Sequence, residues 1–312
     1  MERIVVPVTT PAAVAAIAAL SARPGTEVVA VAVEVGNATP LDALREAALA
    51  AGARACHGVD ARASLAADVL WPAVASGALG VAGEPLVTAL SMVAVAQAAV
   101  AAARHDQATS LAAWAEDARE RQRLHALLKA LAPSLGVVTV RSSAPALVAQ
   151  NIWARVQVLG DSDGAGPMPE SAPKPADVLL TVGFAQGRAV ALNGVAMTPA
   201  ALVMSLDAIG RAHGVRPLVV RGDGAGSRRW QVQAPAALAL HRAGESLRAR
   251  VLDDRAEAFA DTVAVEYATL IRDGLWFTAL RAGLDAFVER VLAPATGDVT
   301  MRVAHGDIEV QG

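Results

Sequence analysis

Short apolar runs alternate with amphipathic stretches of helical length through the first sixty residues. The apolar runs predict strands and the amphipathic stretches predict helices. In chain order the predicted elements are a strand at Ile4–Val8, a helix at Pro11–Leu20, a strand at Glu27–Val35, a helix at Leu41–Ala51 and a weak strand near Arg54–Val59. This alternation predicts a parallel sheet with helices on its faces.

The pattern then becomes helical for a long stretch. Residues Ala61–Leu131 have helical periodicity, interrupted at Pro72, Gly77–Gly83 and Pro85, before a further strand at Gly136–Val140. We therefore expect a first domain at residues 1–140 and a second at 141–312. Residues Gly160–Pro175 are rich in Gly, Pro and Ser and predict a loop or linker.

Strands and helices are mixed differently in the second half. Val178–Phe184 and Arg188–Leu192 alternate like a strand pair around Gln186-Gly187, and Asn193-Gly194 predicts a second turn. Helices are expected from Thr198-Pro199 to His213 and at Ala236–Leu247, Arg255–Asp273 and Ala279–Leu292, followed by two strands within Gly297–Val310 that turn at His305–Asp307. This pattern favours an α+β second domain.

Composition narrows the class of protein. Hydrophobic residues make up 54% of the chain but aromatic residues only 3%, so the core is expected to consist of small side chains. The formal net charge is −3 without long runs of like charge, which argues against a nucleic-acid partner. The apolar stretch Leu86–Ala103 is mostly Ala and Val, so we expect a buried helix and no membrane span. The start of the chain lacks the features of a signal peptide, which favours the cytoplasm.

Cysteine and histidine give few candidates for chemistry. The single Cys56 cannot form an internal disulfide, and the six histidines show no close metal-ligand spacing, so no metal is expected. Cys56, His57 and Asp60 could supply a nucleophile and a base. Adjacent strand residues point to opposite faces, however, so a buried structural cysteine is the alternative interpretation.

Several segments of the chain together resemble one enzyme family. They are VDAR at Val59–Arg62, EPLVTAL at Glu84–Leu90, NIWAR at Asn151–Arg155, VALNG at Val190–Gly194, APAA at Ala234–Ala237, GLWFTALRAGLDAFV at Gly274–Val288 and TGDV at Thr296–Val299. Their order and spacing resemble argininosuccinate synthases, weakly before the linker and strongly after it. The resemblance implies a nucleotide-binding-type α/β domain with a parallel sheet, followed by an α+β synthetase-type domain. It also implies ATP-dependent joining of citrulline to aspartate, through adenylation of the ureido oxygen, in a homo-oligomer.

The segment after the first strand differs from the family's phosphate loop, Ser-Gly-Gly-x-Asp-Thr-Ser. Here the strand is followed by Thr9, Thr10 and Pro11, without glycine. Glycine loops bring backbone amides to phosphate, and proline has no N–H to offer. Thr9 and Thr10 could still bind a small anion, or they could cap the following helix. On this comparison we expect no ATP bound in the family's manner, and no cofactor.

Other segments that resemble the family's substrate sites also differ from them. Glu84 stands where the family has Tyr and Met92 where it has a carboxylate-binding Arg. Residues Ala112–Glu120 replace a glycine-rich loop with strong helix formers, and Arg123 in the same predicted helix is expected to be solvated or paired along the helix. Asn151, Trp153 and Arg155 match the family, which we interpret as packing and structural pairing.

These differences predict a protein that is not competent for citrulline–aspartate ligation. The first hypothesis is a repurposed biosynthetic enzyme acting on another small molecule, and the alternative is a noncatalytic pseudoenzyme that binds a metabolite or a protein partner. A homo-oligomer formed through the second domain is expected in either case. Arg228, Arg229 and Trp230 could bind an anionic or planar ligand, or could form an exposed hairpin with a packed Trp. The ligand-binding candidates are Glu84, Thr88, Ser91, Arg119, Gln150, Asn151, Arg155, Arg228 and Trp230, with Thr9 and Thr10 as weak nucleotide-binding candidates.

Overall fold

The computed structural model describes residues 2–81, 86–115, 117–140, 148–159, 176–221 and 229–311. The chain divides into two compact units that are not two consecutive stretches of sequence. Unit 1 consists of Met1–Leu65, Thr88–Ala146 and Leu270–Thr278, and unit 2 of Ala66–Val87, Leu147–Thr269 and Ala279–Gly312. The predicted linker at 160–175 lies outside the described residues.

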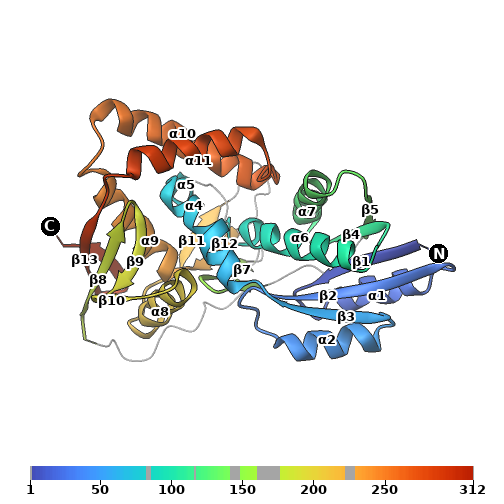
Figure 1. The fold of residues 1–312 in the computed structure, drawn as a ribbon. Coiled ribbons are helices and arrows are strands. Elements are labelled where there is room, and N and C mark those ends of the chain that lie inside the picture. Colours follow the sequence, from blue (N-terminus) through green and yellow to red (C-terminus); the bar gives the residue numbers. More distant parts are fainter. Residues whose placement is uncertain are drawn as a thin grey trace. The chain divides into compact units, whose positions relative to one another are not determined.

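Unit 1 is built on a parallel sheet of five strands in the order β3-β2-β1-β4-β5. Its strands are β1 (Glu2–Val8), β2 (Thr26–Glu34), β3 (Ala55–Asp60), β4 (Ser110–Trp114) and β5 (Gly136–Val140). Its helices are α1 (Ala13–Ser21), α2 (Leu41–Ala50), α3 (Arg62–Ser64), α6 (Val87–His105) and α7 (Ala118–Leu131). In Figure 1, α1 and α2 lie on one face of this sheet and α6 and α7 on the other.

Alternating strand residues build the core between the sheet and its first two helices. Ile4, Val6 and Val8 of β1 join Ile17 of α1 and Leu44 of α2 in one buried cluster. Because both faces of the sheet are covered, its central strands are apolar at nearly every position. The sequence prediction of strand, helix and strand from Ile4 to Val35 is therefore confirmed.

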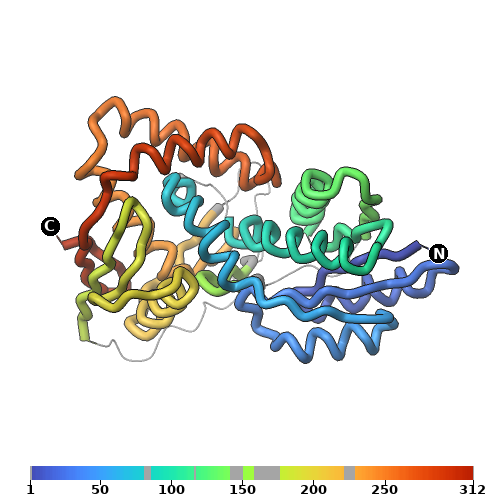
Figure 2. The backbone as a smooth tube through the Cα atoms, viewed as in Figure 1, coloured from blue at the N-terminus to red at the C-terminus, as the bar shows by residue number. Residues whose placement is uncertain are grey.

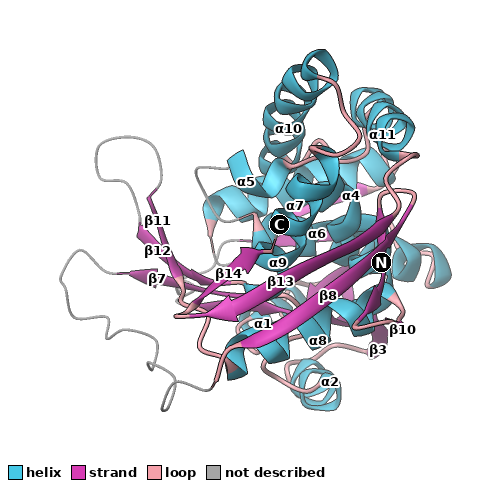
Figure 3. Ribbon diagram, turned by 90° about the vertical axis from the view of Figure 1, so that its left-hand side faces the viewer, coloured by secondary structure: helices cyan, strands magenta, loops and turns pink. Residues whose placement is uncertain are grey.

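Unit 2 contains two antiparallel sheets, of five strands in the order β10-β9-β8-β13-β14 and of four strands in the order β11-β12-β7-β6. The strands are β6 (Val148–Asn151), β7 (Ala154–Leu159), β8 (Val178–Ala185), β9 (Arg188–Leu192), β10 (Val195–Ala196), β11 (Leu218–Arg221), β12 (Arg229–Gln233), β13 (Gly297–Ala304) and β14 (Asp307–Val310). The helices are a π-helical segment η1 (Leu65–Leu70), α4 (Trp71–Ala75), α5 (Ala78–Val81), α8 (Pro199–Ala212), α9 (Pro235–Arg248), α10 (Asp254–Asp273) and α11 (Ala279–Leu292). Figure 3 shows β8 and β13 side by side in the larger sheet.

Three tight turns fix the hairpins of the larger sheet. Gln186-Gly187, Asn193-Gly194 and His305-Gly306 each have two successive residues with positive φ, between 50° and 80°. This conformation gives the two-residue turns whose twist matches that of the flanking strands. The β8–β9 hairpin can be followed as a continuous tube in Figure 2. All three turns were predicted from the sequence, and the α/β fold class with its α+β second part is confirmed.

One long helix passes the length and composition test for a membrane span. Among the described residues this is α6, and 67% of its most apolar window is buried inside the fold. A helix whose surface is mostly covered by protein packs as a core helix, which agrees with the sequence prediction and with a soluble protein.

Candidate functional site

The carboxyl edge of the parallel sheet is where a ligand site is expected in unit 1. The strand order reverses between β1 and β4, since β2 follows β1 on one side and β4 lies on the other. Open α/β sheets bind ligands outside the carboxyl ends of their strands at this switch point. The residues that follow β1 and β4 therefore form the candidate site of this unit.

Thr9 and Thr10 lie at this edge, immediately after β1. Both are half-buried, and the N–H of Ala13 donates to the carbonyl of Thr10 over 3.2 Å. The cap position of α1 is held by Ala12, so neither threonine occupies the cap position, and the cap interpretation is corrected. The first turn of α1 starts at the switch point, where the helix dipole favours an anion, although the N–H groups of Val14 and Ala15 already donate to the carbonyls of Pro11 and Ala12.

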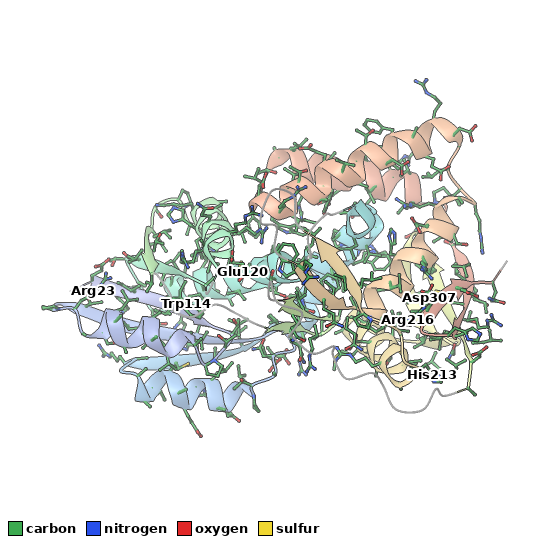
Figure 4. All side chains as sticks on the ribbon, turned by 180° about the vertical axis from the view of Figure 1, so that it is seen from behind. Arg23, Trp114, Glu120, His213, Arg216 and Asp307 are labelled. Carbon is green, nitrogen blue, oxygen red and sulfur yellow. The ribbon has the colours of Figure 1, made fainter. Side chains whose placement is uncertain are left out.

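The segment after β4 corrects the expectation of a continuous helix over Ala112–Glu120. Ser110–Trp114 is β4, buried at every position, and α7 starts only at Ala118. Asp117 caps α7 by accepting from the N–H of Arg119 at 2.8 Å and of Glu120 at 3.4 Å. Alanine favours helices in isolation, but burial between two neighbouring strands overrides that preference here. Trp114 and Glu120, on either side of the cap, are labelled in Figure 4.

Two arginines of α7 have different environments. Arg119 is exposed in the first turn, at the carboxyl edge of the sheet. Arg123 is only 6% exposed, and its guanidinium donates to the backbone carbonyl of Arg272. The expectation that Arg123 is solvated is therefore wrong. A buried cation bonded to a carbonyl holds α7 against the segment Leu270–Thr278 of the same unit.

The candidates near the start of α6 are described only in part. Thr88 and Ser91 are half-buried and three residues apart, so they share one side of the helix. Glu84 and Arg228 lie outside the described residues.

The smaller sheet of unit 2 has one polar face. Residues opposite each other in the ladders share a face, and Gln150 pairs with Arg155, Arg155 with Gln233, and Gln157 with Gln231. Arg155 donates from Nε and Nη2 to Oε1 of Gln150, at 3.2 and 2.9 Å. An arginine held in this way presents an oriented guanidinium among half-buried and buried amide side chains, an arrangement suited to carboxylate recognition.

Trp230 does not share this surface. It pairs with Val158, one position out of step with Arg155, so alternation places it on the opposite face with Val156 and Val232. The expectation of one lining that contains both Arg155 and Trp230 is therefore wrong. Trp230 is half-buried among these valine positions, as in the alternative interpretation of a packed Trp.

Sequence reasoning missed an acidic partner on α8. Asp207 is 8% exposed, and its Oδ2 lies 2.6 Å from Arg211. Burial raises the pKa of this carboxyl, while the nearby charges of Arg211 and Arg155 lower it. The effect of burial is the largest, so the pKa of Asp207 is raised overall. The helical spacing of Asp207 and Arg211 was readable in the sequence, but their proximity to Arg155 depends on the tertiary fold.

Asn151 and Trp153 have structural contacts. The Asn151 side chain is buried, donates to the carbonyl of Val87 at 3.2 Å and accepts from the N–H groups of Trp153 and Ala154 at 3.1 and 3.0 Å. These bonds close the β6–β7 turn. Trp153 is 1% exposed. These contacts fit the interpretation of both residues as packing and pairing residues, and ligand binding by Asn151 stays a prediction.

Cys56 and His57 point away from each other. Cys56 packs against the core cluster formed by α1 and α2, and burial raises the pKa of its thiol. His57 instead pairs with Asp106, with 2.6 Å between Nε2 and Oδ2. The nucleophile–base pairing is therefore absent, and the structural interpretation of Cys56 fits its surroundings.

A polar pocket of about 300 Å³ lies in unit 2, away from the predicted residues. Its lining comes from η1, α4, the β8–β9 turn and α11, and includes Asp68, Arg188, Arg281 and Asp285. Figure 4 displays the side chains of this unit, where His213, Arg216 and Asp307 are labelled.

Comparison with known proteins decides the family. The model of the arginosuccinate synthase N-terminal HUP domain matches residues 11–153, and that of the arginosuccinate synthase C-terminal domain matches residues 167–312. The chain belongs to the argininosuccinate synthase family. Its relatives include the argininosuccinate synthase of Rubrobacter xylanophilus, which is 31% identical over 92% of this chain and 80% of the relative. That of Chlorobium phaeobacteroides is 30% identical over 92% of this chain and 81% of the relative. That of Dehalococcoides mccartyi is 28% identical over 96% of this chain and 82% of the relative.

Family membership corrects three of the expectations drawn from the local differences. The prediction of a protein not competent for ligation, whether repurposed or noncatalytic, is contradicted by relatives named argininosuccinate synthase over more than nine tenths of the chain. The prediction of a degenerate phosphate loop in a pseudoenzyme is contradicted by the match to both domains. The prediction of no ATP conflicts with the match to the nucleotide-type N-terminal domain. The collinear match of both domains outweighs the local differences at the phosphate loop and in the substrate segments.

Proposed function

We propose that this protein is an ATP-dependent ligase of the argininosuccinate synthase type, which joins citrulline to aspartate. The observation that carries the proposal is the consecutive match to both domains of the family, at residues 11–153 and 167–312. A ligase of this kind needs a nucleotide site and two amino-acid sites. Candidates for the nucleotide site and for amino-acid binding are found among the described residues.

The nucleotide phosphates are proposed to bind at the carboxyl edge of the parallel sheet. The supporting features are the start of α1 at the switch point and the half-buried Thr9 and Thr10 that precede it. Threonine hydroxyls donate hydrogen bonds to phosphate oxygens, and the helix N-terminus favours their negative charge. Pro11 supplies no N–H, and the loop has no glycine, so hydroxyls replace part of the amide contacts. Within the family the chain is thus proposed to be a divergent member at this loop.

The amino-acid substrates are proposed to use the polar face of the smaller sheet in unit 2. Both substrates carry carboxylates, which an oriented guanidinium binds with two parallel hydrogen bonds. Arg155 is the candidate for this role because Gln150 fixes its orientation.

We further propose that the protein acts in the cytoplasm as a homo-oligomer assembled through unit 2. Exposed apolar residues on this unit support an assembly surface, among them Leu179 and Val195, each 59% exposed. Native mass spectrometry of the purified chain tests the assembly, and a monomer at micromolar concentration would contradict it.

The ligase proposal is tested by release of pyrophosphate. We expect turnover only when ATP, citrulline and aspartate are all present. Arg155→Ala is expected to lose activity through a raised KM for an amino acid, whereas Gln122→Ala, an exposed position on α7, serves as control. Pyrophosphate release that does not require citrulline, or none with all three substrates, would contradict the proposal.

A further inference from the structure

Two histidines and an aspartate meet at the edge of unit 1 opposite to the proposed nucleotide site. His57 comes from β3, His105 is the last residue of α6, and Asp106 follows it shortly before the start of β4. One ligand atom of each side chain lies within 4.8 Å of those of the other two. We propose that His57, His105 and Asp106 bind a divalent transition-metal ion, of which Zn²⁺ is the best match.

The donor set fits zinc chemistry. Two imidazole nitrogens and a carboxylate oxygen are ligands that Zn²⁺ takes in tetrahedral sites with water in the fourth position. Nε2 of His57 lies 2.6 Å from Oδ2 of Asp106, and Nδ1 of His105 lies 3.5 Å from Oδ1. Metal–ligand bonds of about 2.0–2.2 Å separate tetrahedral ligand atoms by about 3.4 Å. The His57–Asp106 pair therefore has to open by less than about 1 Å. The two histidines face different oxygens of Asp106, so the carboxylate has to turn to offer one oxygen to an ion that both histidines bind.

The backbone around these residues is well fixed. The N–H of Asp106 donates to the carbonyl of Ala102 at 2.9 Å, and the N–H of Ala108 donates to Ala103 at 2.8 Å. Gln107 between them has a φ of 52°, so the helix ends in a left-handed cap. His57 lies on a strand paired in register with β2. Ligands carried by a capped helix and a sheet strand need little ordering on binding.

The electrostatic surroundings favour a cation. The carboxyl end of α6 has the negative pole of the helix dipole, in addition to the charge of Asp106. Arg3 donates to the backbone carbonyl of Asp106, and its guanidinium also pairs with Glu27, which Arg54 shares. Side-chain exposure of 75% for His105 and 36% for His57 gives an ion direct access from solvent.

The test is metal binding to the purified full-length chain after treatment with a chelator. Titration with Zn²⁺ by calorimetry is expected to show one ion per chain. Co²⁺ is expected to give the intense visible absorption of a tetrahedral site. His57→Gln, His105→Gln and Asp106→Asn each remove one ligand, and His125→Gln on α7 is the control. Circular dichroism verifies that each variant is folded, and the exposed His105 is the change with the least effect on folding.

Mutation of a residue that hydrogen-bonds to a metal ligand typically lowers the metal affinity about 10–100-fold, so removal of a ligand itself is expected to lower the Zn²⁺ affinity at least that much. The proposal is supported if all three ligand variants lose that affinity while His125→Gln retains it. Retention of the wild-type affinity in any ligand variant, or no binding to the wild type, would overturn it and leave a hydrogen-bonded His57–Asp106 pair. The readout does not depend on ligase activity, so it stands apart from the test of the proposed function.

Discussion

Asn151 provides the sharpest test of whether a family-like residue is structural. Its side chain is 2% exposed and accepts from two backbone N–H groups, at 3.1 and 3.0 Å. Replacement by Ala leaves the N–H groups of Trp153 and Ala154 without this acceptor in a buried turn. Each unsatisfied buried group costs about 1–3 kcal/mol, so Asn151→Ala is expected to lower the free energy of unfolding by about 2–6 kcal/mol.

Urea unfolding followed by far-ultraviolet circular dichroism measures this loss as a lower midpoint. The matched control is Gln157→Ala on the next strand, where a half-buried side chain is removed and the change is expected to stay within about 0.5 kcal/mol. A loss of less than about 1 kcal/mol for Asn151→Ala would refute the reasoning, because the turn would then not depend on the amide.

The remaining predictions concern pH. Burial first, and then a 2.7 Å hydrogen bond to Asp285, raise the pKa of Tyr267, the single tyrosine of the chain. The folded protein is therefore expected to show no phenolate absorbance near 295 nm as the pH passes about 10. Its stability is expected to fall above that pH, because only the phenol of the unfolded chain ionises there. A phenolate transition near pH 10 in the native protein would contradict this. Hydrogen bonds from Arg3 and Arg54 lower the pKa of Glu27, so its contribution is present above the ordinary carboxyl pKa and is lost as the pH falls through the lowered value. Urea midpoints measured between neutral and acidic pH are expected to fall less steeply in Glu27→Gln than in the wild type, and parallel curves would show that the ion pairs do not act as described.

Sequence patterns predicted the correct secondary structure where one local signal dominated. The strand–helix–strand start of unit 1 has apolar runs of the right lengths, and the Asn193-Gly194 turn has the residues that positive φ requires. Ser110–Trp114 was missed because its composition favours a helix, whereas its conformation is set by pairing with β1 and β5. Arg123 was misjudged for a similar reason, since its partner is a carbonyl 149 positions away in the chain.

In the candidate sites, too, local pairings could be predicted from the sequence and contacts between distant segments could not. The pairing of Gln150 with Arg155 lies within one short hairpin, and both residues were among the sequence candidates. Trp230 was assigned to the same lining because strand parity in β12 was not established from sequence. The His57–Asp106 pair joins residues 49 positions apart, so no spacing rule in the sequence reveals it.

We propose that this chain joins citrulline to aspartate at the expense of ATP. The most direct measurement uses citrulline labelled with ¹⁸O at the ureido oxygen, incubated with the protein, ATP and aspartate. Adenylation of that oxygen followed by attack of the aspartate amine transfers the label to AMP, so mass spectrometry is expected to find ¹⁸O-labelled AMP in equal amount to argininosuccinate. Unlabelled AMP, or no argininosuccinate after prolonged incubation, would contradict the account.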